Sequence, residues 1–217
     1  MARYKQKYKY LPVLSLIICI TFPLGACLNL KQPDNKTEHY SLEYDPPARQ
    51  NRPSVSHAIT VDQFAVSPIY NTHRIIYREG SFKREAYVYY KWRANPGDVV
   101  TYFLRRDMQQ SGLFKAVVSS NSRLQPAHRL EGTIDEFLEW DKKNGWEALL
   151  SVSITFMQEN EPDISKKILF QKSYSSTQPC RQKNPMALAE AMSLAMSEVS
   201  AQIILDIYTF ILSTEPQ

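Results

Sequence analysis

The sequence is 217 residues long, has 26 lysines and arginines against 22 aspartates and glutamates, and carries a formal net charge of +4 at pH 7. The basic excess comes entirely from residues 1–26, which contain four basic and no acidic side chains, so the remainder has 22 of each sign. This balance gives no indication of a nucleic-acid-binding protein, and we expect no nucleic-acid partner.

The first 26 residues have the three parts of a secretory signal. A basic start is followed by an apolar run, residues 11–26, which is 16 residues long and contains Pro12 and Pro23. A membrane-spanning helix needs about 20 apolar residues, so this run is short and interrupted for that role. We predict a signal peptide at residues 1–26, with an uncleaved N-terminal anchor as the alternative.

The signal ends in Leu24-Gly25-Ala26-Cys27, which resembles the lipobox of bacterial lipoproteins. The resemblance implies cleavage before Cys27, which then carries the acyl chains that hold the protein on a membrane. Two or more chains give durable anchoring, whereas one gives only marginal binding. Leu28, rather than an aspartate, follows the cysteine and implies delivery to the periplasmic face of the outer membrane.

Residues 27–38 form a polar, lipidated tether in this interpretation, and residues 39–217 form the folded domain. The eleven residues after Cys27 reach less than about 40 Å when fully extended, so the domain must lie close to the membrane. Of the three cysteines, only Cys180 remains free in the mature chain, so no intrachain disulfide is expected.

The first half of the domain predicts four strands and a helix. Residues with high strand propensity occur at 39–47, 57–66, 74–80 and 84–92, and the last two are expected to pair as a hairpin. A helix is predicted after Asn95, a suitable N-cap followed by proline, and it ends at Gly112. A further strand is predicted at 113–119.

The second half contains the clearest alternation of apolar and polar residues. It predicts strands at 130–140 and 146–156, joined by a turn at 142–145, and another strand at 164–174. The first of these strands is expected to turn one apolar side toward the core, formed by Leu130, Ile134, Leu138 and Trp140.

Three carboxylates on this strand need an explanation. Asp135 and Glu139 are expected on the solvated side of the strand, together with other polar residues. Glu136 falls on the apolar side, where it is either a buried charge paired with an arginine or a residue at the strand edge. None of the three is expected to be catalytic.

A long helix is predicted from Met186 to about Leu212, after an Asn-Pro start, because this segment has no glycine or proline and much alanine and methionine. Its apolar residues form one continuous stripe that can cover a sheet. The whole domain is therefore predicted to be α+β: a single domain with a mixed, largely antiparallel sheet and two helices packed on one face.

The sequence contains no recognisable catalytic or metal-binding motif. The four histidines, at positions 39, 57, 73 and 128, have no second ligand at metal-binding spacing. Cys180 lies in a polar loop before the last helix, without a nearby base in sequence. We expect no enzyme activity, no metal and no cofactor.

Aromatic residues are concentrated in the strand at 84–92. Tyr87, Tyr89, Tyr90 and Trp92 occur within six residues, and tyrosine and tryptophan are favoured at protein interfaces. These four residues are our candidate partner interface. The alternative is a strand that packs on both of its faces.

The order of these segments resembles the ABC-type transport auxiliary lipoprotein family, which includes the PqiC lipoprotein. The resemblance rests on the lipobox, "YSLEY", "ITVDQFAV", the hairpin "RIIYREG…YVYYKW", "SGLFKAVV", "LEGTIDEF" and the alanine-rich last helix. It covers nearly all of the mature chain. Lys91, where arginine is usual, and "AHRL" at residues 127–130 depart from the family pattern.

The resemblance implies a docking and assembly component of an MCE-type ABC lipid transport system, with an MCE-domain protein as partner and a ring-shaped homo-oligomer as its assembly. An alternative is a periplasmic carrier that holds an apolar ligand between the sheet and the last helix. Its lining would be Met192, Ala195, Met196 and Val199.

Overall fold

The computed structural model describes residues 36–49 and 51–214. Cys27, the predicted signal peptide and most of the predicted tether lie outside the described residues. The described chain forms a nine-stranded sheet and three helices, with residues 36–217 grouped as one compact unit.

The strands are β1 Glu38–Tyr40, β2 Val55–Val61, β3 Ala65–Val66, β4 Arg74–Arg78, β5 Glu85–Trp92, β6 Phe114–Ser119, β7 His128–Lys142, β8 Gly145–Gln158 and β9 Ile168–Pro179. The helices are α2 Pro96–Ser111, α3 Ile164–Lys167 and α4 Pro185–Thr214.

The 15-residue strand β7 organises the sheet. One edge pairs along its whole length with β8 in antiparallel orientation, and β8 pairs in turn with β9. The opposite edge pairs in succession with β2, β3 and β4, all parallel to β7. The long ladders are antiparallel and the short ones are mostly parallel, so the predicted α+β fold with a mixed, largely antiparallel sheet is confirmed.

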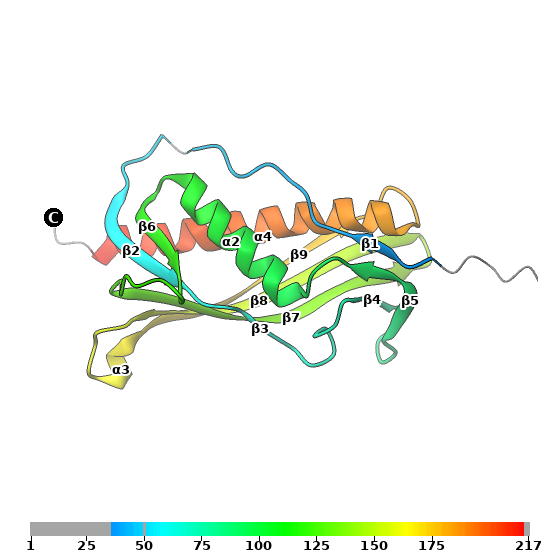
Figure 1. Ribbon diagram of the computed structural model, residues 1–217, viewed down its shortest axis with the longest axis horizontal. Helices are drawn as coiled ribbons and strands as arrows, with labels where there is room; N and C mark the ends of the chain where they lie inside the picture. The colour runs from blue at the N-terminus through cyan, green and yellow to red at the C-terminus, as the bar shows by residue number, and fades with distance from the viewer. Residues whose placement is uncertain (1–35, 50, 215–217) are drawn as a thin grey trace, which may run out of the picture. The chain divides into compact units, whose positions relative to one another are not determined.

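Both long helices cover the same face of the sheet (Figure 1). Helix α4 packs on β8 and β9, while α2 packs on β6 and against α4. The N-cap predicted for α2 is present: the Asn95 side chain accepts a hydrogen bond from the Gly97 amide at 3.0 Å. Gly112 ends the helix in the left-handed conformation, at φ 68°.

By length and composition, α4 could cross a membrane. Half of the apolar window that meets this criterion is buried inside the fold, as is common for a core helix of a soluble domain. Its buried apolar stripe covers the sheet, so packing within the domain accounts for that part of its hydrophobicity, while Met186, Leu194, Leu205 and Leu212 are exposed.

Three of the predicted strands differ clearly from the structure. The strand predicted at 57–66 is divided into β2 and β3, with residues 62–64 between them outside the sheet. The strand predicted at 39–47 stops at Tyr40, because the following residues leave the sheet and cross the helices. There, the Glu43 amide donates to Ser193 Oγ at 3.0 Å. The strand predicted at 164–174 begins only at Ile168, because Asp163 caps a helical turn, α3, by accepting from the Ser165 amide.

A β-bulge at Asp135 changes the predicted faces of β7. Ile134 lies opposite Val152 but Glu136 lies opposite Ser151, so one residue is inserted and the side-chain alternation is inverted beyond it. Phe137 and Glu139, instead of Leu138 and Trp140, therefore share the helix-covered face with Leu130 and Ile134.

The same bulge corrects the assignment of the carboxylates. Glu139, expected in solvent, is completely buried. Glu136 lies on the opposite face with Trp140 and pairs with Arg78 at 3.4 Å, so the predicted arginine partner is present, but the carboxylate is half-buried instead of buried. Arg78 also lies over the Trp140 ring, with its Cζ 3.9 Å from the ring centroid.

Gly132 is required by close packing within the core. A Cβ atom at this position would lie 2.3 Å from Phe64 Cε2, and Phe64 is itself buried. The Phe64 amide is fixed by Thr101 Oγ1 of α2 at 2.9 Å, so the ring cannot withdraw without disturbing the contact between sheet and helix. The glycine thus allows an aromatic ring to lie directly on the backbone of β7.

We predict that Gly132→Ala lowers the free energy of unfolding by about 2 kcal/mol, measured by urea denaturation, because the new methyl group overlaps the Phe64 ring. Gly80→Ala is the matched control, since nothing lies within 4 Å of a Cβ atom there. Phe64→Leu should reduce the cost of the alanine, which a double-mutant cycle will detect. Equal effects of the two glycine substitutions would contradict this account.

Candidate functional site

The four predicted interface residues on β5 have different environments. Trp92 is only 2% exposed and packs edge-on against Phe137, with ring centroids 5.2 Å apart. Tyr89 is 39% exposed, and its neighbour Val88 is 60% exposed. Trp92 therefore lies in the core, whereas Tyr89 and Val88 present apolar area to solvent.

Tyr87 and Tyr90 are half-buried and belong to an aromatic cluster. The Tyr87 ring lies 4.6 Å from that of Tyr77, 5.5 Å from Tyr90 and 6.3 Å from Trp146, measured between centroids. A register shift between β4 and β5 permits Tyr87 and Tyr90 to meet, although their spacing of three does not place them on one face of a regular strand.

The Tyr87 hydroxyl donates to Glu139 Oε1 at 3.0 Å. The pKa of Glu139 is raised to about 7, mainly by burial and in part by Asp141, while the Tyr87 hydrogen bond and Lys183 oppose the shift. Burial also raises the pKa of the nearby Cys180 thiol to about 11. A largely protonated thiol is a poor nucleophile, so this neighbourhood lacks an activated cysteine.

An apolar recess of about 270 Å³ lies between β1, the end of β5 and the first turns of α2. Its lining includes Tyr40, Leu42, Trp92, Val99, Tyr102 and Phe103. It exists because the chain leaves the sheet after Tyr40 and crosses α2. Of the interface residues, only Trp92 borders it, and it does so from the core.

The chain segment that closes this recess is fastened to α2 by Tyr44. The Tyr44 ring stacks on Phe103, with centroids 4.9 Å apart, and its hydroxyl donates to Asp107 Oδ2 at 2.6 Å. Asp107 is buried and also accepts two hydrogen bonds from the Arg106 guanidinium, at 2.8 and 2.9 Å. Its charge is therefore compensated.

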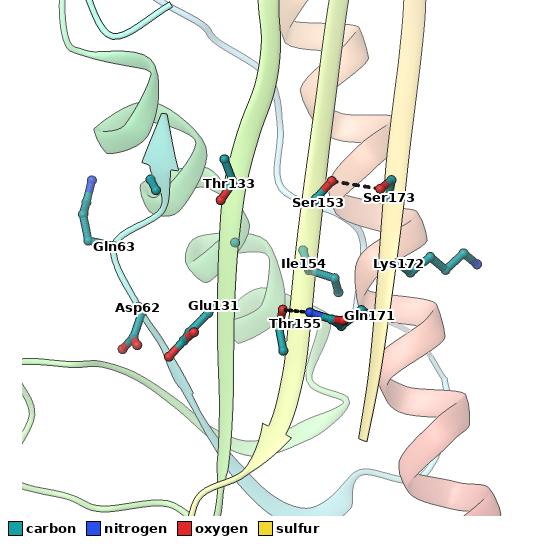
Figure 2. A pocket seen from close by; sticks show the side chains of 12 residues that line it. Asp62, Gln63, Glu131, Thr133, Ser153, Ile154, Thr155, Gln171, Lys172 and Ser173 are labelled. Carbon is teal, nitrogen blue, oxygen red and sulfur yellow. Dashed lines mark hydrogen bonds between the residues drawn. The ribbon is translucent and has the colours of Figure 1, made fainter. Parts of the chain in front are cut away.

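A larger polar groove, of about 700 Å³, lies on the sheet face opposite the helices. Figure 2 shows hydroxyl and amide side chains that extend from β7, β8 and β9. Neighbouring strands are linked across it, since Ser153 Oγ and Ser173 Oγ are 2.8 Å apart and Gln171 Nε2 donates to Thr155 Oγ1 at 3.0 Å (Figure 2).

Neither hollow has the groups of a catalytic centre. In the polar groove, Ser153 Oγ donates to Asp135 at 2.6 Å, but no histidine or lysine lies between them to act as a general base. Within residues 36–49 and 51–214, no group of three or more histidine, cysteine or acidic side chains could hold a metal ion.

The lining proposed for a lipid carrier is also accounted for by packing. Met192, Ala195, Met196 and Val199 are completely buried in the hydrophobic core between α4 and the sheet. None of them lines either of the two hollows described above.

The buried Glu139 predicts a pH-dependent stability. Its pKa is near 4.5 when exposed and about 7 in the folded state, so the folded protein binds the proton more tightly. Stability is therefore highest below pH 4.5 for this group and falls as the pH rises through 7, by about 3 kcal/mol in total.

Urea denaturation at a series of pH values should show this fall in the wild type and a flatter profile in Glu139→Gln, which retains an acceptor for Tyr87. Glu131→Gln, at an exposed position on the same strand, is the control and should keep the wild-type slope. An unchanged slope in Glu139→Gln would disprove the assignment.

Comparison with solved structures identifies the fold independently of the sequence pattern. The protein XCC0632 from Xanthomonas campestris superposes with a TM-score of 0.73 at 15% identity, over 82% of this chain and 98% of that one. The hypothetical protein CT253 from Chlamydia trachomatis superposes with a TM-score of 0.51 at 9% identity, over 74% of this chain and all of that one.

No curated protein matches the chain in sequence. At the family level, the model for the ABC-type transport auxiliary lipoprotein component matches residues 40–204, from the end of β1 to most of α4. This confirms the resemblance drawn from the sequence, and it covers most of the chain. The protein belongs to the ABC-type transport auxiliary lipoprotein family.

Proposed function

We propose that this protein is an outer-membrane lipoprotein, acylated at Cys27, that acts as a docking and assembly component of an MCE-type ABC lipid transport system. The family match over residues 40–204 carries the proposal, because it connects the folded domain with transport and with lipidation. The lipobox at Cys27 and the preceding signal supply the anchor.

The surface supports a role in protein contact. The exposed Val88 and Tyr89 offer apolar area on β5, the strand that carries the aromatic cluster. In this proposal the partner is an MCE-domain protein, and several copies of this chain form a ring that receives its distal end. The buried Trp92 and the half-buried Tyr87 and Tyr90 pack against the domain and so support this strand.

The dimensions of the apolar recess favour docking over a carrier function. Sites for small ligands usually enclose about 300–1,000 Å³, and the recess, at about 270 Å³, is below this range. The larger groove is lined mainly by polar side chains, which do not suit an acyl chain.

Cys27→Ser should be lost from the outer membrane, whereas the wild type should remain with the outer membrane after fractionation. Cys180→Ser is the matched control, because its thiol lies within the folded domain and has no part in anchoring. Retention of Cys27→Ser in the outer membrane would exclude acylation as the anchor.

The double substitution Val88→Ser and Tyr89→Ser should weaken binding of the co-expressed MCE-domain protein by roughly tenfold, measured on purified components, because exposed aromatic residues often dominate interface energy. Leu124→Ser, at another exposed apolar residue, should leave binding unchanged. If the folded double variant of Val88 and Tyr89 bound the MCE-domain protein as tightly as the wild type, these two residues would not belong to the interface.

Trp92→Ala should instead lower the free energy of unfolding by about 4 kcal/mol.

A further inference from the structure

Phe82 stands out among the exposed apolar residues of the domain. It lies in the turn between β4 and β5 and is 100% exposed, so its ring is not covered by any part of the described chain. Scattered apolar residues on a protein surface are common, but a completely uncovered phenylalanine at the tip of a hairpin has the form of an inserting group.

Hydrogen bonds and ion pairs within the hairpin fix the backbone of the turn that carries Phe82. The Arg84 guanidinium donates to the Ser81 carbonyl at 2.9 Å and closes the turn on both sides of Phe82. Lys83 Nζ lies 2.7 Å from Glu85, whose carboxylate also accepts a hydrogen bond from the Tyr77 hydroxyl. The turn is therefore braced, while the ring remains free.

The charges of the tip compensate each other. Lys83 pairs with both Glu79 and Glu85, and Arg84 offsets the second acidic residue. An anionic surface is therefore attracted only weakly, and a contact made by this tip depends on burial of the Phe82 ring.

The position of the tip follows from the pairing of β1. This strand runs parallel to β5, with Glu38 opposite Tyr90 and Tyr40 opposite Trp92. The first residue of β1 therefore lies on the side of β5 where its first residues and the preceding turn are found. Figure 1 shows β1, β4 and β5 at one end of the sheet and α3 at the other end.

We propose that Phe82 inserts into the interfacial layer of the membrane that holds the acyl anchor, as a second contact that orients the domain. This inference rests on the proposed acylation at Cys27. The tether is shorter than about 40 Å, and the chain enters the domain from the end where the tip lies, so the tip remains within reach of the lipid surface.

One phenylalanine alone binds a bilayer weakly. Once the acyl chains hold the protein on the surface, however, insertion is an intramolecular step with a high effective concentration of lipid. The α3 end, with the exposed Ile164, is then held away from the membrane.

The test uses the acylated mature protein in phosphatidylcholine vesicles, with a fluorophore that responds to polarity. It is attached through Phe82→Cys or through Ile164→Cys, each combined with Cys180→Ser to leave one free thiol. Ile164 is 80% exposed and lies at the opposite end of β7, so it is a matched control. Thermal unfolding verifies that both labelled proteins are folded.

The probe at position 82 should shift its emission to shorter wavelength and be protected from an aqueous quencher, whereas the probe at position 164 should show neither change. The emission shift at position 82 should not depend on the salt concentration. Protein that floats with vesicles while the probe at 82 stays in water overturns this inference and leaves the anchor proposal intact. Equal shifts at both positions also overturn it. Acylated protein that does not float with vesicles overturns both proposals.

Discussion

The architecture depends on backbone hydrogen bonding along both edges of β7. One edge is matched residue by residue to β8, while the other is divided among β2, β3 and β4. Because a single strand joins all of these partners, the aromatic hairpin at one end and the polar groove along the sheet belong to one rigid frame. The helices then only need to cover the apolar face that this frame creates.

Because of the bulge at Asp135, the side chains at the two ends of β7 pack against different parts of the domain. Before the bulge, Leu130 and Ile134 point toward the helices, and the outward positions contribute to the polar groove. After it, the inward positions carry Phe137, which contacts Trp92, and Glu139, which accepts from Tyr87. The one-residue insertion thus couples the long hairpin of β7 and β8 to the tyrosine cluster of β5, at the cost of burying a carboxyl group.

Local chemistry explains which parts of this fold could be predicted from the sequence. The helix caps at Asn95 and Gly112 and the alternating strand at 146–156 are determined by neighbouring residues, and they occur as predicted. The bulge and the crossing segment at Tyr44 depend on contacts with distant residues, such as Asp107, and periodicity does not encode them. The aromatic residues of β5 were identified as a group, but a register shift with β4 determines which of them are exposed.

Several buried and half-buried charged groups of this domain already have partners within the fold. Its strongest polar groups are used within the fold: Asp107 is satisfied by Arg106 and Tyr44, and Arg129 by Asp62 and Glu159. Side chains that are already committed to structural partners are poorly available for proton transfer or metal binding. The apolar groups left uncovered on the hairpin are Phe82 and Val88, together with the partly exposed Tyr89. Burial of such groups on a membrane or another protein, as proposed above, would release water without any bond being made.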